Sequence, residues 1–260
     1  MPSGDAAGIR YAVDALVQGF PGRATRHGAL GWSGITLLRG GGRAVLVDAG
    51  GFGLRAPLAQ ALAERGLGPG DVTDVLLTHV HYDHAVNALL FPRAAVWISA
   101  ADLAWARDRP PGFDPVPELY AVALDGDPRT RRVEGDGPVF AGVDAIAAPG
   151  HTPGSVVYRV ATAGGQDVLF AGDAVKNRAE LLSGEVDLTE DRAASEASVR
   201  MVRDLWEATP GAVLVPGHDV PMRVGPDGRP EYTARRVAGV EAWLGADLAD
   251  TTRFDLGDGA

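Results

Sequence analysis

The residues best able to do chemistry in this chain are histidines that come directly after apolar runs. Three of them lie in the six-residue segment HVHYDH (79–84), which also contains Asp83. Two more, His151 and His218, each follow an apolar run that ends in Pro-Gly. Neutral imidazole is the usual nitrogen ligand of zinc and related divalent ions, and carboxylates supply oxygen ligands. This spacing favours a metal centre over a set of unrelated loop histidines.

An aspartate extends the same pattern. Asp173 ends the apolar run VLFAGD, as the histidines end theirs. Because strand ends on one edge of a sheet meet in space, seven side chains are expected to converge: His79, His81, Asp83, His84, His151, Asp173 and His218. Seven ligands are too many for one tetrahedral ion, so two ions with open positions fit better.

The elements that must position these ligands follow from the spacing of apolar residues. GITLLRGGGRAVLVDAG (34–50) predicts two strands joined by a glycine turn. DVTDVLLTH (71–79) predicts a buried strand that ends in polar residues. Between them a helix is expected, with Pro57 in its first turn and one apolar face made by Leu54, Leu58, Ala61 and Leu62.

The rest of the chain continues this alternation. AAVWISAADLAWARD (94–108) predicts a strand followed by a helix, and RPPGFDPVPE (109–118) predicts a loop. Four more strands, two of them a hairpin, are expected in VDAIAAPGH, SVVYRVATAGGQDVLFAGD and GAVLVPGHD. A last helix is expected to start near Glu231. Another is expected over about 190–208, with an apolar face of Ala194, Ala197, Met201, Leu205 and Ala208. Strands that alternate with helices indicate sheets covered by helices.

Composition narrows the classes of partner. The chain has 260 residues, 46% of them apolar, which is enough for a full core. A net charge of −10 argues against a nucleic-acid partner, because phosphate backbones need a basic surface. With no cysteine, disulfides and thiolate ligands are excluded. No apolar run is long enough for a membrane span and no secretory signal is visible, so we expect a cytoplasmic protein without a membrane partner.

On these residues the sequence resembles the metallo-β-lactamase-fold hydrolase superfamily. The likeness rests on His-x-His-x-Asp-His at 79–84, followed by His151, Asp173 and His218 in that order, and it spans about residues 34–218. It implies an α/β (α+β) fold, a four-layer αββα sandwich with the metals at one edge between the sheets. We expect one hydrolase domain over residues 1–246, followed by a polar, acidic tail over 247–260 that frays.

The resemblance also implies roles for the seven residues. His79, His81 and His151 would hold a first ion, Asp83, His84 and His218 a second, and Asp173 would bridge them. The ions would be zinc, with Mn²⁺ or Fe²⁺ as alternatives. A metal-bridging hydroxide would attack a small carboxylic ester, thioester or lactone. Asp83 would orient the nucleophile and return a proton to the leaving group, unless it serves as a ligand only.

Other activities of such folds stay open. The same metal pair could cleave a phosphodiester. A mononuclear iron dioxygenase of persulfides would need fewer ligands than this chain has, and a catalytically silent binding protein would need none. Asp173 weighs against a zinc β-lactamase, since those enzymes generally lack the bridging aspartate. Homoserine lactonases resemble the chain in all seven ligands, but they have tyrosine where this sequence has Lys176.

Several further residues are candidates for the surroundings of the site. Lys176, the single lysine of the chain, either is exposed or pairs with the carboxylate or phosphate of an anionic substrate. Asp48 and Thr78 are expected to contact ligand histidines, and His27 to be an ordinary loop histidine. The loops 20–33 and 108–137 are expected to form the walls of a small-molecule pocket. Six further residues are candidates for its lining, although we expect most of the aromatic ones to lie in the core: Trp32, Phe52, Trp97, Trp105, Tyr120 and Arg178. A homodimer is common for such folds, although no surface pattern requires one.

Overall fold

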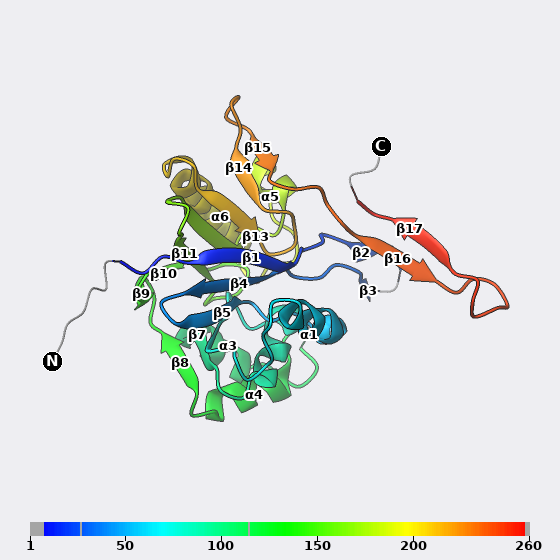
Figure 1. Cartoon of the computed structure of the whole chain (residues 1–260). Helices are drawn as coiled ribbons and strands as arrows, with labels where there is room; N and C mark the ends of the chain where they lie inside the picture. The colour runs from blue at the N-terminus through cyan, green and yellow to red at the C-terminus, as the bar shows by residue number, and fades with distance from the viewer. Residues whose placement is uncertain (1–7, 27, 114, 258–260) are drawn as a thin grey trace.

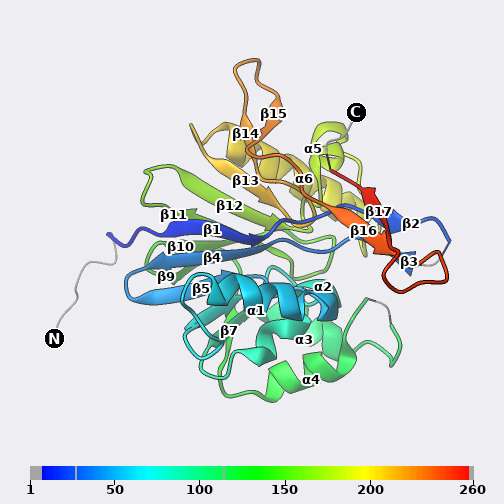
Figure 2. The same cartoon turned by 45° about the vertical axis from the view of Figure 1, so that its right-hand side comes forward.

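Two β-sheets packed face to face form the centre of the molecule (Figures 1 and 2). The computed structural model describes residues 8–26, 28–113 and 115–257. The first sheet has the order β1 (Ala12–Val17), β4 (Ile35–Gly40), β5 (Arg43–Val47), β6 (Asp74–Leu76), β7 (Ala95–Ser99) and β8 (Thr130–Val133). The second has the order β15 (Pro230–Tyr232), β14 (Met222–Val224), β13 (Val213–Pro216), β12 (Asp167–Gly172), β11 (Val156–Ala161), β10 (Val143–Ala147) and β9 (Gly137–Phe140).

Helices cover the outer face of each sheet. Three 3₁₀ or short helical turns and three longer helices belong to the first sheet's half of the chain: η1 (Phe52–Leu54), α1 (Arg55–Ala63), α2 (Tyr82–Ala85), η2 (Val86–Leu90), α3 (Ala100–Arg107) and α4 (Glu118–Gly126). The second sheet is covered by α5 (Arg178–Ser183) and α6 (Arg192–Glu207). The expected four-layer αββα sandwich is therefore confirmed.

Three apolar clusters fill the spaces between these layers. One joins the first sheet to its helices, for example through Leu46 and Leu62. A second joins the other sheet to α6 through Leu214 and Trp206. The third lies between the sheets and includes Leu38, Val45, Val47, Tyr158 and Phe170. Neighbouring residues of one strand thus belong to different clusters, which explains why these strands read as continuous apolar runs.

Parallel pairing brings the ends of several strands to one edge. Strands β5, β6, β7 and β8 run parallel in the first sheet, and β12 runs parallel to β13 in the second. The segment HVHYDH follows β6, Asp173 follows β12 and His218 follows β13. His151 follows β10, which pairs antiparallel with β11. Parallel strands end at the same edge, so this topology is what assembles the site.

Most of the expected elements are present with the expected partners. The hairpin of β4 and β5 and the hairpin of β11 and β12 both form. In α1, three of the four expected face residues are buried and the fourth packs against them. The sequence did not indicate β1, β8, β9, β14 or α4, so residues 108–137 are not the continuous loop that was expected.

The face of α6 was predicted only in part, because Met201 and Leu205 pack against the second cluster as expected but are not its most buried residues. The helix lies within the expected range, but Ala197 and Ala208 are exposed, whereas Val199, Val202 and Trp206 are buried. The reason is that serines complete the buried stripe. Ser198 is buried because its hydroxyl donates to the Pro149 carbonyl oxygen at 2.7 Å. A pattern that counts only apolar residues misses such a satisfied polar position.

The helix expected near Glu231 was also wrong. That segment forms β15 and then β16 (Gly239–Ala242), which pairs with β17 (Thr252–Asp255). Tyr232 and Arg236 both donate hydrogen bonds to the buried Asp219, which fixes the segment against the second sheet. Residues 252–255 of the expected tail are therefore part of a hairpin. A further short pair is β2 (Arg23–Ala24) with β3 (Gly28–Ala29). No helix in the described part of the chain combines the length and apolarity needed to cross a bilayer.

Candidate metal centre

The seven predicted residues meet at one edge of the sandwich. They form three overlapping groups. Within each group, one nitrogen or oxygen atom from every residue lies within 4.8 Å of those of the other members. We call His79, His81 and His151 the first group, and Asp83, His84 and His218 the second group. Asp173 lies between them, since it clusters with His79 and His84. The expected convergence of strand ends is thus present.

Asp48 and Thr78 fix the two ends of the segment HVHYDH. Asp48 accepts hydrogen bonds from the backbone N–H and the hydroxyl of Thr78, at 2.8 and 2.9 Å. Its Oδ2 lies 2.8 Å from Nδ1 of His84, and the Thr78 hydroxyl lies 3.2 Å from Nδ1 of His79. The contact to Asp48 holds the proton on Nδ1 of His84 and leaves Nε2 for a metal. The contacts expected for Asp48 and Thr78 are confirmed.

Strained backbone supports both groups. Among the described residues, Asp48 (φ 56°) and Leu188 (φ 47°) are the two non-glycine residues with positive φ. Asp48 contacts Nδ1 of His84, and the carbonyl oxygen of Leu188 lies 3.0 Å from Nδ1 of His151. Such strain costs free energy and persists where the surroundings enforce it, commonly at functional sites. Here each strained residue orients one imidazole of the site.

Asp173 reaches both groups from the end of β12. Its Oδ1 lies 3.2 Å from Nε2 of His84 and 3.3 Å from Nε2 of His218, and its Oδ2 lies 3.2 Å from Nε2 of His151. Gly217 makes this approach possible, because a Cβ at that position would lie 2.1 Å from Asp173 Oδ1. Asp173 is therefore placed to share its charge between the two groups.

The two groups differ in their electrostatics. Burial lowers the pKa of His79 and of His151 well below the usual value, and lowers the pKa of His81 to about 4. In the second group burial also opposes charge, but carboxylates led by Asp173 raise the pKa of His84 well above its usual value and raise the pKa of His218. Burial therefore favours the neutral imidazole in the first group, whereas nearby carboxylates favour the protonated imidazole in the second.

The donor set fits divalent metal ions. Nitrogen and oxygen are the donors that zinc and related ions take from proteins, and neutral imidazole is the form that binds. Among the described residues, Nε2 of His79 is buried without a hydrogen-bond partner. An orphaned ring nitrogen costs free energy unless something binds it. A cation between these side chains would satisfy that atom and neutralise the carboxylates of Asp83 and Asp173.

One buried carboxylate beside the first group was not found from the sequence. Asp102, at the start of α3, is fully buried, and burial raises its pKa to about 6. Neither oxygen has a hydrogen bond of good geometry, but the Thr152 hydroxyl and the backbone N–H groups of Val80 and Gly154 oppose the rise. Asp102 thus joins the loop of His79 and His81 to the loop of His151. Its motif, ISAAD, reads as an ordinary helix start, so no sequence signal marked it.

The side chain of Lys176, the single lysine, forms an ion pair with Glu180. Its Nζ lies 2.9 Å from Glu180 Oε1, and its backbone N–H donates to Glu180 Oε2 at 2.8 Å. Its side chain is only 13% exposed, so the alternative of an exposed lysine was wrong. Its backbone carbonyl oxygen accepts the N–H of His218 at 2.8 Å. Lys176 therefore borders the second group while its charge is balanced by Glu180.

The other expected pocket residues divide into three sets. Trp32 and Phe52 line a pocket, and Tyr120 packs edge-on against Phe52. Trp105 lies near His81. Trp97 is in the core between the sheets, and Arg178 stacks over the Tyr232 ring. His27 lies outside the described residues.

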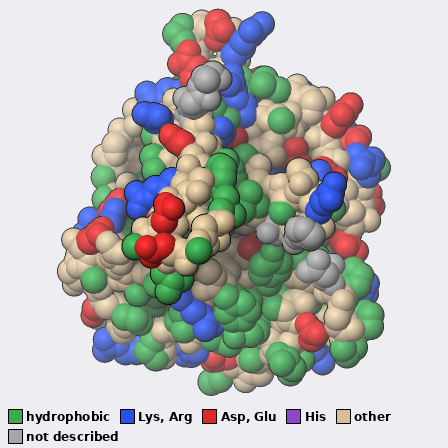
Figure 3. Space-filling model, turned by 90° about the vertical axis from the view of Figure 1, so that its right-hand side faces the viewer, with side chains coloured by type: hydrophobic (Ala, Val, Ile, Leu, Met, Phe, Trp, Pro, Cys, Tyr) green, Lys and Arg blue, Asp and Glu red, His purple; other side chains and the backbone are tan. Residues whose placement is uncertain are grey.

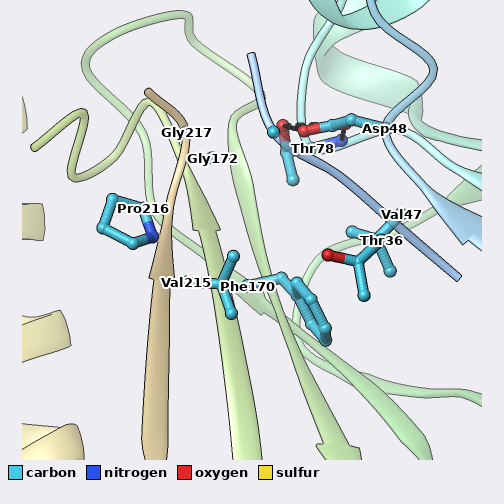
Figure 4. Close-up of a pocket in the computed structure, with 10 residues that line it drawn as sticks. Thr36, Val47, Asp48, Thr78, Phe170, Gly172, Val215, Pro216 and Gly217 are labelled. Atoms are coloured by element: carbon cyan, nitrogen blue, oxygen red, sulfur yellow. Dashed lines mark hydrogen bonds between the residues drawn. The ribbon is translucent and has the colours of Figure 1, made fainter. Parts of the chain in front are cut away.

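Two cavities adjoin the site, and they differ greatly in size. One of about 10 Å³ lies between the sheets behind Asp48 and Thr78 (Figure 4). It has room for at most a single water. The other, of about 330 Å³, opens at the surface, and Asp83 forms part of its wall. Its remaining walls are mainly apolar: Leu30, Gly31, Trp32, Gly51, Phe52, Gly53, Leu54 and Tyr82. On this face of the molecule, hydrophobic side chains lie around a hollow (Figure 3). The larger pocket has the size and lining of a small-molecule site.

The fold and the site together define a metal-dependent hydrolase. The chain belongs to the metallo-beta-lactamase superfamily, whose family model matches residues 34–218.

Individual relatives lie within this family. Metallo-beta-lactamase domain-containing protein 1 of Xenopus laevis is 29% identical over 217 residues, which cover 84% of this chain and 83% of that protein. The Homo sapiens protein of the same name is 37% identical over 183 residues, 69% of this chain and 59% of that protein. The match therefore spans less than two thirds of the human protein. The solved structure of AidC, a dizinc quorum-quenching lactonase, is 19% identical and has a TM-score of 0.64, with coverage of 78% and 79%. At that identity the likeness shows the fold alone.

Proposed function

We propose that this protein is a dinuclear metal-dependent hydrolase of a small carboxylic ester, thioester or lactone that carries an apolar group. The observation that carries the proposal is the double position of Asp83. It belongs to the second group and also lines the apolar pocket of about 330 Å³. A substrate that buries its apolar part in this pocket brings its reactive carbon next to the metal-binding side chains.

The proposed ligands are the residues that the sequence indicated. We assign the first group to one ion and the second group to another, with Asp173 between them. Zinc is the proposed metal, because three imidazoles are a donor set that catalytic zinc takes, with Mn²⁺ or Fe²⁺ as alternatives. The ions, when bound, would supply a water of lowered pKa and polarise the scissile carbonyl.

Asp83 is the residue placed to move a proton. Its side chain is 18% exposed, and its Oδ2 lies 3.3 Å from Nε2 of His218. A carboxylate that is partly open to the pocket can accept a proton and return it to the leaving oxygen or sulfur. Trp32 and Phe52 would exclude water from the apolar part of the substrate. A lactone is one candidate, supported by the dizinc lactonase among the structural neighbours.

A substrate screen on metal-loaded protein tests this proposal. The panel contains an aryl ester, a thioester, a lactone, a phosphodiester and a β-lactam, with the metal content of the same sample measured per chain. We expect hydrolysis of at least one carboxylic substrate, two ions per chain, and no activity in His81→Ala. Activity on the phosphodiester alone would establish the phosphodiesterase alternative instead. A single iron with persulfide oxidation would establish the redox alternative.

Truncating the pocket tests the apolar specificity. Phe52→Ala should lower kcat/KM for a long-chain acyl ester by about tenfold, because burying an aromatic ring contributes ~1–3 kcal/mol. The same variant should change kcat/KM for an acetyl ester far less. Val224→Ala is the matched control, since Val224 is a partly exposed apolar residue outside the pocket. Equal losses on the long and the short ester would contradict this use of the pocket.

A further inference from the structure

The C-terminal arm (residues 237–257) stands apart from both main sheets. Its two strands, β16 and β17, pair with each other and with no other strand of the described chain. Figures 1 and 2 show the arm projecting from the body near β2 and β3. All four residues of β17 are exposed, whereas β16 alternates between exposed and half-buried residues. A lone two-stranded hairpin has little stability in water. The arm is therefore short of contacts, and the outer edge of β17 is its free surface.

The hydrogen bonds inside the arm define which groups face outward. The Leu256 N–H donates to the Ala238 carbonyl oxygen at 2.9 Å, in register with the four pairs of β16 and β17. Hydrogen-bonded and non-hydrogen-bonded pairs alternate along an antiparallel ladder. The pair of Val240 and Phe254 is therefore hydrogen-bonded within the arm. It follows that Arg253 and Asp255 point their backbone N–H and C=O groups away from β16.

We propose that β17 pairs antiparallel with β17 of a second copy of this chain, so that two arms form one four-stranded sheet. Residues whose backbone N–H and C=O groups point outward must lie opposite such residues of the partner strand. Several registers satisfy this condition, and they differ in which residue lies on the two-fold axis. A pair centred on Arg253 or on Asp255 would place like charges opposite each other. A pair centred on Phe254 places Arg253 opposite the partner's Asp255, and Asp255 opposite the partner's Arg253. Opposite charges in direct cross-strand positions are stabilising and like charges are not, so charge selects this register.

The two faces of this sheet would be complementary as well. Phe254, which is 47% exposed, lies on the face opposite to Arg253 and would meet the partner's Phe254 at the two-fold axis. Arg253 Nε already lies 3.2 Å from Glu241 Oε1, and a guanidinium has enough donors for two carboxylates. Charged side chains and proline on an edge strand usually discourage pairing with another chain. This edge carries one charge of each sign two residues apart, which is an arrangement that complements itself.

A proline on the outward edge tests the backbone pairing. Arg253→Pro removes an outward N–H and the side-chain contact to Glu241 but none of the backbone hydrogen bonds between β16 and β17, and proline is tolerated at such edge positions. We expect the wild type to be a dimer by light scattering, with a dissociation constant that rises about tenfold or more in Arg253→Pro. Glu241→Pro is the matched control, because it loses the same side-chain contact to Arg253 but removes an outward N–H from β16 instead. It should leave the dimer intact.

Charge reversal tests the register. Arg253→Asp alone and Asp255→Arg alone should each lose self-association, because each places like charges opposite one another. An equimolar mixture of the two variants should recover a dimer, since each charge then meets its opposite. Both positions are exposed, so thermal unfolding should stay near that of the wild type and report that the variants are folded. The metal centre takes no part in this assay.

Three results would overturn the proposal. The first is a wild type that stays monomeric throughout a dilution series. The second is a dimer that none of the three β17 variants weakens, since its interface would then lie elsewhere. The third is a charge-reversed mixture that fails to associate, which would exclude pairing centred on Phe254.

Discussion

The two groups of the candidate metal centre contain similar residues but differ in the electrostatics of their histidines. In the first group, burial keeps all three histidines neutral, with the pKa of His81 lowered to about 4. In the second, the carboxylates of Asp173, Asp48 and Asp83 raise the pKa of His84 in spite of complete burial. Metal binding needs neutral imidazole, which burial favours in the first group and which the carboxylates disfavour in the second. Neighbouring charges, and not burial alone, therefore set the pKa of a buried histidine.

Removing one ligand from each group should give the largest effects. His81→Ala should lose one bound ion per chain and His218→Ala the other, with activity falling by more than the roughly 10–100-fold that outer partners of a ligand cost. Metal content per chain and kcat/KM measure this, with His27→Ala as the control. Loss of both ions in both variants would show that the two groups form one cooperative site.

The pH dependence of Asp102 should give the next largest effect. Its folded pKa of about 6 lies above the ordinary 3.8, so burial favours the neutral carboxyl. Ionising the buried Asp102 carboxyl therefore lowers the free energy of unfolding. This loss of stability is absent below pH ~4, grows as the pH rises, and is complete above pH ~6. Wild type should therefore lose up to about 3 kcal/mol relative to Asp102→Asn over this range. Chemical denaturation of both metal-free proteins checks it, and a difference in free energy of unfolding that is independent of pH would contradict it.

The carboxylates outside the ligand set should act on different groups. Asp48→Asn removes the negative charge beside His84 Nδ1, and Asp102→Asn weakens the link between the loops of the first group. Each should lower metal affinity by about 10–100-fold at its own group only. Competition with a chelator measures the two affinities. Equal losses at both groups in each variant would remove the distinction between them.

The smallest effect is expected at Lys176. Because Glu180 already balances its charge, Lys176→Met should change kcat/KM by a similar factor for an anionic and a neutral ester. Kinetics on a matched pair of such esters measures this. A loss of about tenfold or more confined to the anionic ester would instead establish Lys176 as a substrate contact.

Much of the site could be predicted because ligand chemistry is local. Histidines and aspartates that follow apolar runs could be recognised by their type and spacing. Strands β6, β12 and β13 could be predicted from their apolar sequences. Asp102 was not predictable, because its role depends on the approach of the loops 78–81 and 150–155, which are distant in sequence. The stripe of α6 was missed for a related reason, since Ser198 is buried only because the Pro149 carbonyl oxygen lies against it. The limits of the domain and the cytoplasmic location stay predictions.

Residue type and apolar periodicity were enough to predict which seven side chains come together and which class of fold gathers them. The electrostatic surroundings of each histidine could be known only from the tertiary structure. Whether a histidine is neutral or charged depends on which carboxylates lie within a few ångströms, and chain order does not contain that distance. The tertiary structure also shows that the last segment forms an arm and not a helix. Its backbone hydrogen bonds join β16 to β17, which are too far apart in sequence for local helix propensity to predict the pairing.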